Sequence, residues 1–312
     1  MTHQKTAILL LAHGSPESPA DVPEFMRYVT GGRPIPEAVV EEVRYRHQQI
    51  GSSPLTKITM AQGAGLEREL GLRVYVGMRN WKPFIADTVR QMMGDGVEHV
   101  LAICLAPQNS STSVGLYRKA LMAEMKPDIT VRFIDSWHDH PLLVKAFSEK
   151  LEPAWRHACQ EASAQVPVVF TAHSVPTRTI QAGDPYEQQA KHTAQLVARS
   201  VGLPAELEYF AFQSQGMSGG PWLGPTVESA MLELKKQGQK SVVVAPVGFV
   251  CDHVEVLYDV DIVFRDFASD QDLLFWRTES LNTSPTFIAA LAELAWSRLG
   301  AASATNPLGP GA

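Results

Sequence analysis

Eight short runs of apolar residues recur along the chain, separated by segments with helical periodicity. Four lie in the first half and four in the second, at residues 7–14, 73–78, 99–107, 129–136, 166–174, 206–214, 241–250 and 273–278. Runs of this length that are rich in β-branched residues are typical of strands buried on both faces of a sheet. We therefore interpret the eight runs as parallel strands.

The segments between these runs are long enough to be crossover helices. The helical pattern covers residues 36–50, 56–70, 83–94, 114–125, 141–162, 184–201, 223–237 and 284–299. Alternation of strands and helices favours parallel sheets with helices on both faces. The pattern thus predicts an α/β fold of the doubly wound, Rossmann-like kind.

The two halves of the chain also resemble each other in detail. LLAHGSP (10–16) and FTAHSVP (170–176) both follow a strand, and the third strand of each half ends in Ala-Pro. We predict two similar domains, residues 1–140 and 141–283, each with a central four-stranded parallel sheet. One large sheet is the alternative.

The last helix has no obvious place to pack within the second half. We predict that residues 284–300 pack back on the N-terminal domain, and that the Gly/Pro/Ala-rich residues 301–312 form a flexible tail.

Composition narrows the function classes. The chain has 312 residues, 45% of them hydrophobic and 19% charged, with a net charge of −6, which argues against non-specific nucleic-acid binding. We see neither a basic-then-apolar leader nor a run of about 20 apolar residues, so we expect a cytoplasmic protein with no transmembrane segment. Three widely spaced cysteines form no metal-binding or disulfide pattern, which indicates buried or inert thiols.

Two histidines stand where predicted strands end. Ligands of open parallel sheets bind beyond the carboxyl ends of the strands, and His13 and His173 both lie there. Two such edges that face each other would form a cleft between the domains. The repeated histidine is either a relic of duplication or places two imidazoles on opposite sides of one substrate.

A group of ionisable residues follows the seventh apolar run. The stretch PVGFVCDHVEVLYDVD (246–261) carries Glu255 and Asp259, which would share one face of an α-helix at i, i+4 spacing. Carboxylates that enter a cleft with an imidazole can pass a cation or protons inward. A solvated helix face is the alternative.

Several familiar catalytic patterns are missing from the sequence. It has no GxSxG elbow, no GxGxxG dinucleotide fingerprint, no GxxxxGK[ST] loop and no HExxH. His138 and His140 in SWHDHP could form a surface metal site, although a solvated loop is the stronger interpretation.

Three motifs of the second half together resemble the ferrochelatases. They are FTAHSVP, FQSQGMSGGPWLGP (212–225) and VAPVGFVCDHVEVLYDVD (244–261), and IGSSPLTKIT (50–59), YVGMRNWKPFIADTV (75–89) and LAPQNSSTSVGLYRKA (105–120) match as well. The resemblance covers nearly the whole chain and implies a chelatase-like fold. It also implies a lyase that inserts Fe²⁺, as a substrate, into a porphyrin during haem biosynthesis, with release of two protons.

The resemblance is strongest to the compact bacterial branch that uses coproporphyrin III. It implies a monomer with no prosthetic group and no iron–sulfur cluster, and porphyrin and ferrous iron as partners. Protoporphyrin IX is the alternative substrate.

The family's metal-handling residues match positions in this chain. The resemblance implies that His173 is a metal ligand or proton acceptor, that Glu255 is its partner, and that Asp259 feeds metal or exports protons. Val263 stands where relatives often continue the acidic line.

The family's porphyrin-binding residues match other positions. His13 stands where relatives carry a tyrosine, and we expect it to approach the ring centre from the face opposite His173. The residues expected to hold propionates are Arg46, His47, Ser53 and Tyr117. Where the branch has a further arginine, this chain has Thr30, for which Arg33 could substitute.

Two other functions remain open. One is a cobalt or nickel chelatase that acts on another tetrapyrrole. The other is a haem carrier without enzymatic activity, which would need His13 but not Glu255 and Asp259. A Glu255→Gln variant separates carriage from metal insertion.

Overall fold

Eight parallel strands form two separate four-stranded sheets in the computed structural model, which describes residues 5–216 and 219–304. The first sheet has the order β2-β1-β3-β4 and the second has the order β6-β5-β7-β8. The bounds are β1 Thr6–Ala12, β2 Arg73–Met78, β3 His99–Cys104, β4 Thr130–Ile134, β5 Val168–His173, β6 Glu208–Gln213, β7 Ser241–Pro246 and β8 Leu274–Arg277. All eight predicted strands and the doubly wound fold class are confirmed, and the alternative of one large sheet is wrong.

The eight predicted helices are also present. They are α2 Glu37–Gln49, α3 Leu55–Leu70, α4 Ile85–Gly94, α5 Val114–Glu124, α6 Pro141–Ala162, α8 Tyr186–Ser200, α9 Val227–Lys236 and α12 Pro285–Ala304. The sequence pattern missed shorter ones: α1 Val22–Thr30, α7 Thr177–Gln181 and α11 Arg265–Asp270. Where one α-helix was expected around Glu255 and Asp259, the structure has α10 Val254–Leu257 and then a π-helix, Asp259–Phe264. These segments are short or irregular, so they show no sustained helical period.

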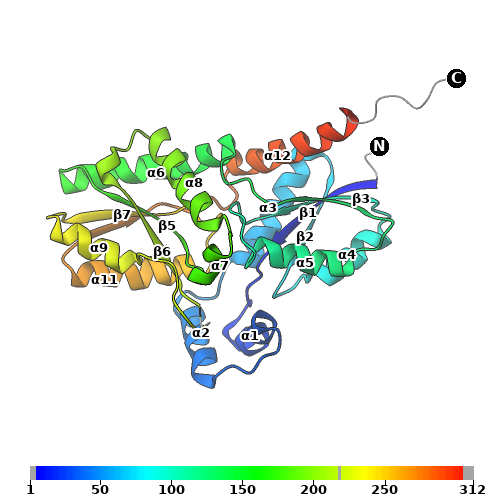
Figure 1. The fold of residues 1–312 in the computed structure, drawn as a ribbon, viewed down its shortest axis with the longest axis horizontal. Helices are drawn as coiled ribbons and strands as arrows, with labels where there is room; N and C mark the ends of the chain where they lie inside the picture. Colours follow the sequence, from blue (N-terminus) through cyan, green and yellow to red (C-terminus); the bar gives the residue numbers. More distant parts are fainter. Residues whose placement is uncertain (1–4, 217–218, 305–312) are drawn as a thin grey trace.

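The two sheets lie side by side and share one hydrophobic core (Figure 1). Leu10 of β1, Phe170 of β5 and Phe287 of α12 all belong to it and are fully buried. Helices α4 and α5 cover the other face of the first sheet, and α9 with α11 cover that of the second. The shared core therefore holds the two halves as one body.

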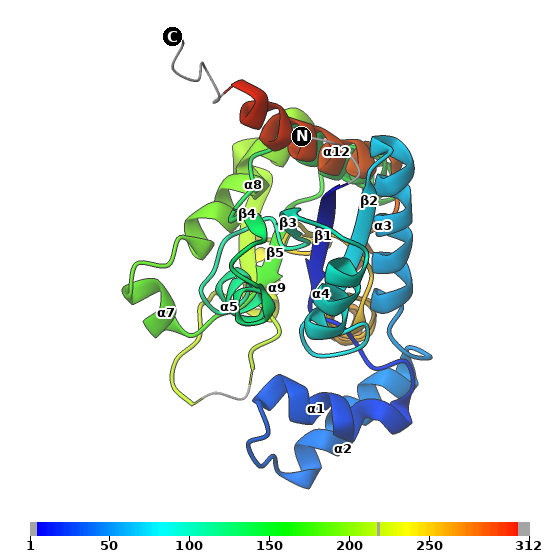
Figure 2. The same ribbon diagram turned by 90° about the vertical axis from the view of Figure 1, so that its right-hand side faces the viewer.

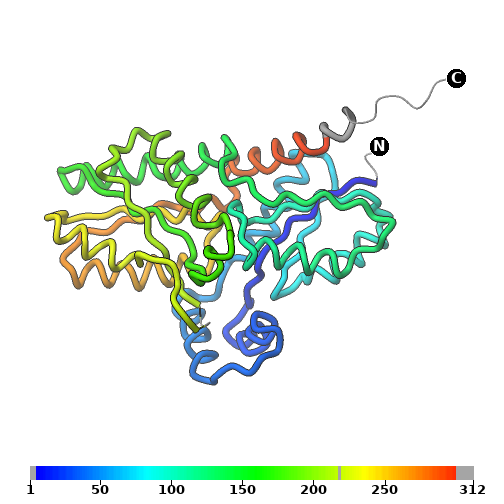
Figure 3. Tube along the Cα trace, viewed as in Figure 1, coloured from blue at the N-terminus to red at the C-terminus, as the bar shows by residue number. Residues whose placement is uncertain are grey.

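The chain passes between the halves twice, and both passages can be followed in Figure 3: from β4 into α6, and from β8 into α12. Helix α12 packs on α3 of the first half and on α6. It runs to Ala304, so the predicted tail begins within the last turn of the helix, and residues 305–312 lie outside the described residues.

Helices α1 and α2 project from the body of the first half (Figure 2). They follow β1 in the chain and pack on each other around a small apolar cluster that includes Phe25, Met26, Val40 and Trp81. This projection lies beside the carboxyl end of β1 and forms one wall of the region described below.

Two glycines allow close packing where strands end. Gly14 follows His13 with a φ of +83°, and a Cβ there would lie 2.8 Å from the Trp81 backbone nitrogen. A Cβ on Gly248, after β7, would lie 2.5 Å from the Cβ of Ala172. Any larger residue at either position would therefore displace the loop that carries a strand-end histidine.

Among the described residues, no helix is both long enough and apolar enough to cross a bilayer. All three cysteines are free thiols; Cys104 and Cys251 are buried and Cys159 is partly buried.

Candidate functional site

His13 and His173 occupy equivalent places in the two sheets. Each directly follows or ends the strand that lies second in its sheet, β1 or β5, at the carboxyl end. Their surroundings differ, because His173 lies among carboxylates and His13 lies beside an arginine.

His173 and Glu255 form an ion pair at the end of the second sheet. The His173 Nε2 atom lies 3.3 Å from the Glu255 Oε1 atom, and each side chain is 32% exposed. The His173 Nδ1–H donates to the carbonyl oxygen of Ser174, which directs Nε2 toward Glu255. The Tyr186 hydroxyl donates to the His173 carbonyl oxygen at 2.9 Å and holds the strand end in place.

Proximity changes the pKa of both partners. Burial alone would lower the pKa of His173, but the charge and hydrogen bond of Glu255 outweigh it and raise that pKa to about 9. Burial alone would raise the pKa of Glu255, yet His173 and His253 hold it well below its usual value. The resting pair is therefore an imidazolium beside a carboxylate.

Glu255 also contacts a second imidazole. The His253 Nε2 atom lies 3.4 Å from Glu255 Oε2, and the His253 Nδ1–H donates to the Cys251 carbonyl oxygen. Thus both oxygens of one carboxylate face imidazole rings.

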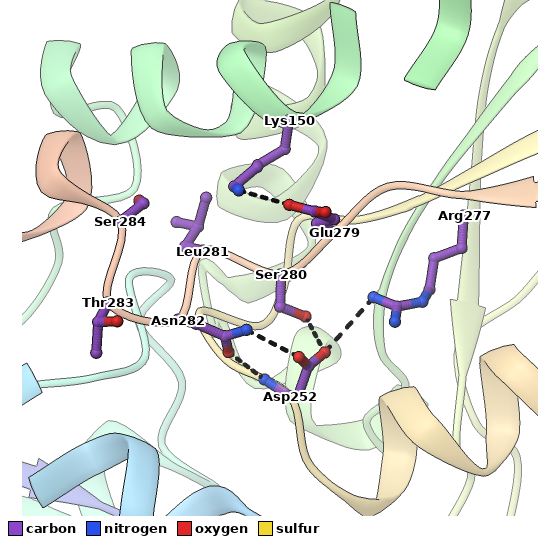
Figure 4. Close-up of a pocket in the computed structure, with 9 residues that line it drawn as sticks. All are labelled: Lys150, Asp252, Arg277, Glu279, Ser280, Leu281, Asn282, Thr283 and Ser284. Carbon is purple, nitrogen blue, oxygen red and sulfur yellow. Dashed lines mark hydrogen bonds and ion pairs between the residues drawn. The ribbon is translucent and has the colours of Figure 1, made fainter. Parts of the chain in front are cut away.

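The segment that carries Glu255 is anchored by Asp252, as Figure 4 shows. The Asp252 carboxylate accepts hydrogen bonds from Ser280 at 2.7 Å and Asn282 at 2.8 Å, and lies 3.5 Å from Arg277. These residues belong to β8 and the loop before α12, and line a cavity of about 420 Å³.

Gln213, a residue that our sequence analysis did not single out, positions both members of the pair. Its side chain is 2% exposed; its Oε1 accepts from Thr171, and its Nε2 donates to the Glu255 carbonyl oxygen at 2.8 Å. It therefore ties β5 to α10. Gln213 lies in the motif FQSQGMSGGPWLGP (212–225), but nothing in the sequence indicates that a glutamine at the end of a strand bridges two other segments.

Asp259 lies one turn beyond Glu255. Helix α10 ends at Leu257 and the π-helix begins at Asp259, so the prediction of one α-helix through both carboxylates is wrong. Asp259 is the first residue of the π-helix, and π-segments often mark functional sites. Val263 lies on the same π-helix and is 37% exposed.

The Asp259 carboxylate joins the two halves of the molecule. It accepts a short hydrogen bond from Ser214 and lies 3.3 Å from the guanidinium of Arg46 on α2. Arg46 also lies over the ring of Tyr258, with its Cζ 5.3 Å from the centroid. Burial raises the pKa of Asp259 to about 6, with opposition from the Ser214 hydrogen bond.

His13 lies at the end of the first sheet. Its side chain is partly open to solvent, and protein groups contact its ring and both of its nitrogens. Its ring meets Phe25 edge-on, its Nδ1–H donates to the Gly14 carbonyl oxygen, and its Nε2 accepts from Asn80 at 2.9 Å. Desolvation and the charge of Arg79 lower the pKa of His13 to about 4. The imidazole is therefore neutral near pH 7.

Arg79 is a second residue that sequence reasoning missed. It follows β2, its Cζ lies 6.0 Å from the centroid of the buried Tyr117 ring, and burial lowers its pKa. Its buried Nε has no hydrogen-bond partner among the described residues. Such a guanidinium is suited to an anion that the protein itself does not supply.

The other residues predicted to bind propionates differ in burial, and each already contacts a protein group. His47 is 1% exposed, and its ring nitrogens meet Ser15 and the Val43 carbonyl oxygen, so its position favours holding α2. Ser53 is 9% exposed and accepts from the Leu55 N–H at the start of α3. Arg33 is exposed and donates to the Thr30 carbonyl oxygen. Direct contact of these residues with a ligand stays a prediction.

The ionisable groups described above come from both halves of the chain and influence one another's charge state. Arg46 of the first half lies 3.3 Å from Asp259 of the second. The charge of Glu255 acts to raise the pKa of both His13 and Tyr117. Imidazole and carboxylate oxygens are ligands for divalent transition metals, and both accept protons. The arrangement can therefore hold a metal ion and remove protons from a bound molecule.

Comparison with known proteins identifies the family. Residues 5–299 match the family model described as Ferrochelatase. A protein named Ferrochelatase, from Acidobacterium capsulatum, is 53% identical over 97% of this chain and 98% of its own length. Proteins named Coproporphyrin III ferrochelatase are 35% identical in Geobacillus sp. (96% of this chain, 99% of the relative) and 32% identical in Bacillus subtilis (96% and 100%).

Solved structures support the fold. The sirohydrochlorin chelatase SirB from Bacillus subtilis subspecies spizizenii, in complex with cobalt, has a TM-score of 0.57 at 12% identity and covers 96% of this chain and 97% of its own. CbiX, described as the terminal enzyme of sirohaem biosynthesis in denitrifying bacteria, has a TM-score of 0.55 at 12% identity, with coverage of 93% and 98%. With a family match over almost its whole length and relatives of this identity, the chain belongs to the ferrochelatase family of metal-insertion enzymes.

Proposed function

We propose that this protein inserts ferrous iron into coproporphyrin III in haem biosynthesis, at the site between its two sheets. The observation that carries the proposal is the ion pair of His173 and Glu255, with an imidazole nitrogen 3.3 Å from a carboxylate oxygen. Relatives named coproporphyrin III ferrochelatases align over nearly the whole chain, which supports this substrate.

Metal insertion releases two protons, one from each pyrrole N–H of the porphyrin. The iron stays ferrous, because it exchanges water and protein ligands for four porphyrin nitrogens while the two protons leave. Glu255 and His173 bind the incoming ion and accept protons in turn. Since the resting His173 is protonated, it must lose its proton before its Nε2 can bind iron.

Asp259 provides a route for these protons. Its pKa of about 6 lies between those of the pair, and a carboxylate that titrates near neutrality both accepts and releases protons. Asp259 begins the π-helix that follows α10, four residues after Glu255, and accepts a hydrogen bond from Ser214. We assign it the transfer of protons, or of hydrated metal, toward Glu255.

His13 approaches the porphyrin from the opposite side. A neutral imidazole is a ligand for haem iron, and the low pKa of His13 keeps Nε2 unprotonated. Because Nε2 accepts from Asn80, that amide has to move before Nε2 can reach the metal. His13 therefore binds the product more readily once Asn80 finds another acceptor.

The propionates require cationic and hydroxyl groups. Arg79 is the structure's strongest candidate, because its Nε has no partner among the described residues. Arg46 becomes available if a propionate displaces Asp259. Ser53 and Tyr117, and Arg33 in place of the residue at Thr30, complete the proposed set.

The proposal includes the organisation of the chain. We assign residues 1–140 and 141–283 to two domains, with α12 docked on α3 of the first, and we propose a cytoplasmic monomer without an iron–sulfur cluster. Sedimentation analysis of the purified protein and its iron and sulfide content test these points.

Anaerobic insertion of Fe²⁺ into coproporphyrin III and into protoporphyrin IX, measured side by side, tests the function. We expect a higher kcat/KM with coproporphyrin III. Turnover of protoporphyrin IX alone would overturn the substrate assignment, and turnover of neither would overturn the proposed reaction.

A further inference from the structure

A second group of potential metal ligands lies away from the ferrochelatase residues described above. His138 and Asp139 belong to the connection between β4 and α6, and His192 lies on α8. One ring nitrogen of each histidine and one carboxylate oxygen of Asp139 lie within 4.8 Å of one another. His192 is distant in sequence from the adjacent His138 and Asp139, so only the fold brings it to them.

The distance between the two imidazoles suits a shared ion. The His138 Nε2 atom lies 3.2 Å from the His192 Nδ1 atom. Two nitrogens that each bind one zinc ion at about 2.0–2.1 Å in tetrahedral geometry are separated by about 3.3–3.4 Å. The observed distance therefore needs only a small adjustment to admit an ion.

Hydrogen bonds select the tautomer of His138 that a metal requires. The Ser136 hydroxyl has one proton and lies 3.1 Å from the Pro107 carbonyl oxygen and 2.8 Å from Gln189 Oε1, both of which only accept. Its oxygen therefore accepts from the Nδ1–H of His138 at 2.8 Å. This leaves the Nε2 lone pair free to face His192, which is the arrangement typical of metal-bound histidines.

The main chain around the cluster is held in place. The Thr193 hydroxyl, next to His192, donates to the His138 carbonyl oxygen at 2.9 Å. Gln108 in turn donates to the Thr193 hydroxyl at 3.1 Å and to the Val247 carbonyl oxygen at 3.2 Å. The two histidines are thus positioned before any ion arrives, which lowers the conformational cost of binding.

We propose that His138, His192 and Asp139 bind a divalent transition-metal ion at a site separate from the place of porphyrin metallation. Two imidazoles and one carboxylate are a donor set that Zn²⁺ and Fe²⁺ accept. The Asp139 side chain is 58% exposed, so water can fill the remaining positions of the ion.

The alternative is a plain hydrogen bond between the two rings. A direct bond accounts for the 3.2 Å contact between the rings. The cluster also holds a carboxylate oxygen of Asp139 within 4.8 Å of one nitrogen of each ring, which a metal ion would use as a third ligand. The hydrogen bond from its Nδ1–H to Ser136 places His138 in the tautomer whose Nε2 is unprotonated and faces His192. A neutral imidazole is the form that binds metal.

A metal ion bound at this site would cross-link the two halves of the molecule. The connection after β4 leaves the first sheet, whereas α8 packs against α6 and the second sheet. An ion between them adds a cross-link beside the shared core. It would stabilise the folded state according to its concentration relative to its dissociation constant.

Zinc binding to the full-length, chelator-stripped protein tests the proposal. His173→Ala and Glu255→Gln are introduced together to silence the porphyrin site, and Zn²⁺ is measured by equilibrium dialysis. We expect one ion per chain in this background. His192→Ala should weaken it by more than about 100-fold, since even outer-shell partners contribute about 10–100-fold to affinity.

Three further variants sharpen the result. Asp139→Asn alters only an exposed carboxylate and should weaken zinc binding without affecting the fold. Ser136→Ala should weaken it through the tautomer of His138. His157→Ala removes a histidine that is 60% exposed on α6 and should change nothing.

Two measurements distinguish this metal site from the ferrochelatase reaction: porphyrin metallation and the effect of zinc on Tm. In the otherwise native chain, His192→Ala should leave porphyrin metallation unchanged, and zinc should raise the Tm of the silenced background but not of its His192→Ala derivative. The proposal is overturned if the silenced background retains no zinc, or if it retains zinc equally after His192→Ala and Asp139→Asn.

Discussion

The Nε2 atom of His173 lies 3.3 Å from the Oε1 atom of Glu255, at the point where β5 ends and α10 begins. Removal of the Glu255 charge by Glu255→Gln should lower kcat for iron insertion by about 10²–10⁴-fold, the usual contribution of a positioned proton acceptor. Porphyrin binding, followed by fluorescence quenching, should persist.

The surface pair of His157 and Glu161, 3.9 Å apart, provides the matched control. Glu161→Gln removes the same charge from the same kind of pair outside the site and should retain full activity. Full activity of Glu255→Gln would instead point to another catalytic carboxylate, whereas porphyrin binding without iron insertion in both the native protein and the variant would favour a haem carrier.

The raised pKa of His173 predicts how metal binding depends on pH. Protons compete with the metal for Nε2, so affinity for Zn²⁺ at this site should rise with pH up to about 9 and then level off. In Glu255→Gln the pKa of His173 should fall and the plateau should begin at lower pH. NMR titration of the imidazole measures the pKa directly, and a value near 6.5 in the native protein would contradict the assignment.

The same pair makes stability depend on pH. The pKa of His173 is raised from 6.5, so its contribution is complete below about 6.5 and is lost as pH rises toward about 9. The pKa of Glu255 is lowered, so its contribution is present above its ordinary value of 4.5 and is lost as pH falls through its folded value. Urea unfolding between pH 6.5 and 9 should therefore show a decline in the native protein that is absent in Glu255→Gln.

His13 should determine the visible spectrum of the product complex. If its imidazole reaches the haem iron, His13→Ala changes the ligand field and shifts the absorption bands. His157→Ala serves as the control. An unchanged spectrum in His13→Ala would leave His13 as a residue that only shapes the turn before Gly14.

The ion pair between Arg46 and Asp259 predicts opposite effects on binding and turnover. Asp259→Asn frees Arg46 for a propionate, so KM for the porphyrin should fall by about two- to fivefold, the range for an ion pair whose arginine is partly exposed. kcat should fall as well, because the carboxylate that exchanges protons is gone. Arg46→Met should raise KM. A fall in kcat with no change in KM in Asp259→Asn would show that Arg46 does not bind the porphyrin.

The fold could be predicted from the sequence because each strand is a short, continuous apolar run. Buried parallel strands and long crossover helices leave strong periodic signals, and all eight strands and eight helices were found. The short helices α1, α7 and α11 and the π-helix left no such signal. Their shape depends on contacts with the sheets and not on local preference.

The sequence by itself determined the fold class, the strand ends that carry His13 and His173, and the carboxylates that follow the seventh strand. Only the tertiary structure decided which groups meet. Asp259 meets Arg46 of the other half, Gln213 ties Glu255 to β5, and Arg79 Nε finds no hydrogen-bond partner among residues 5–216 and 219–304. These relationships join residues far apart in the chain, and their electrostatics depend on burial, which a linear pattern does not encode.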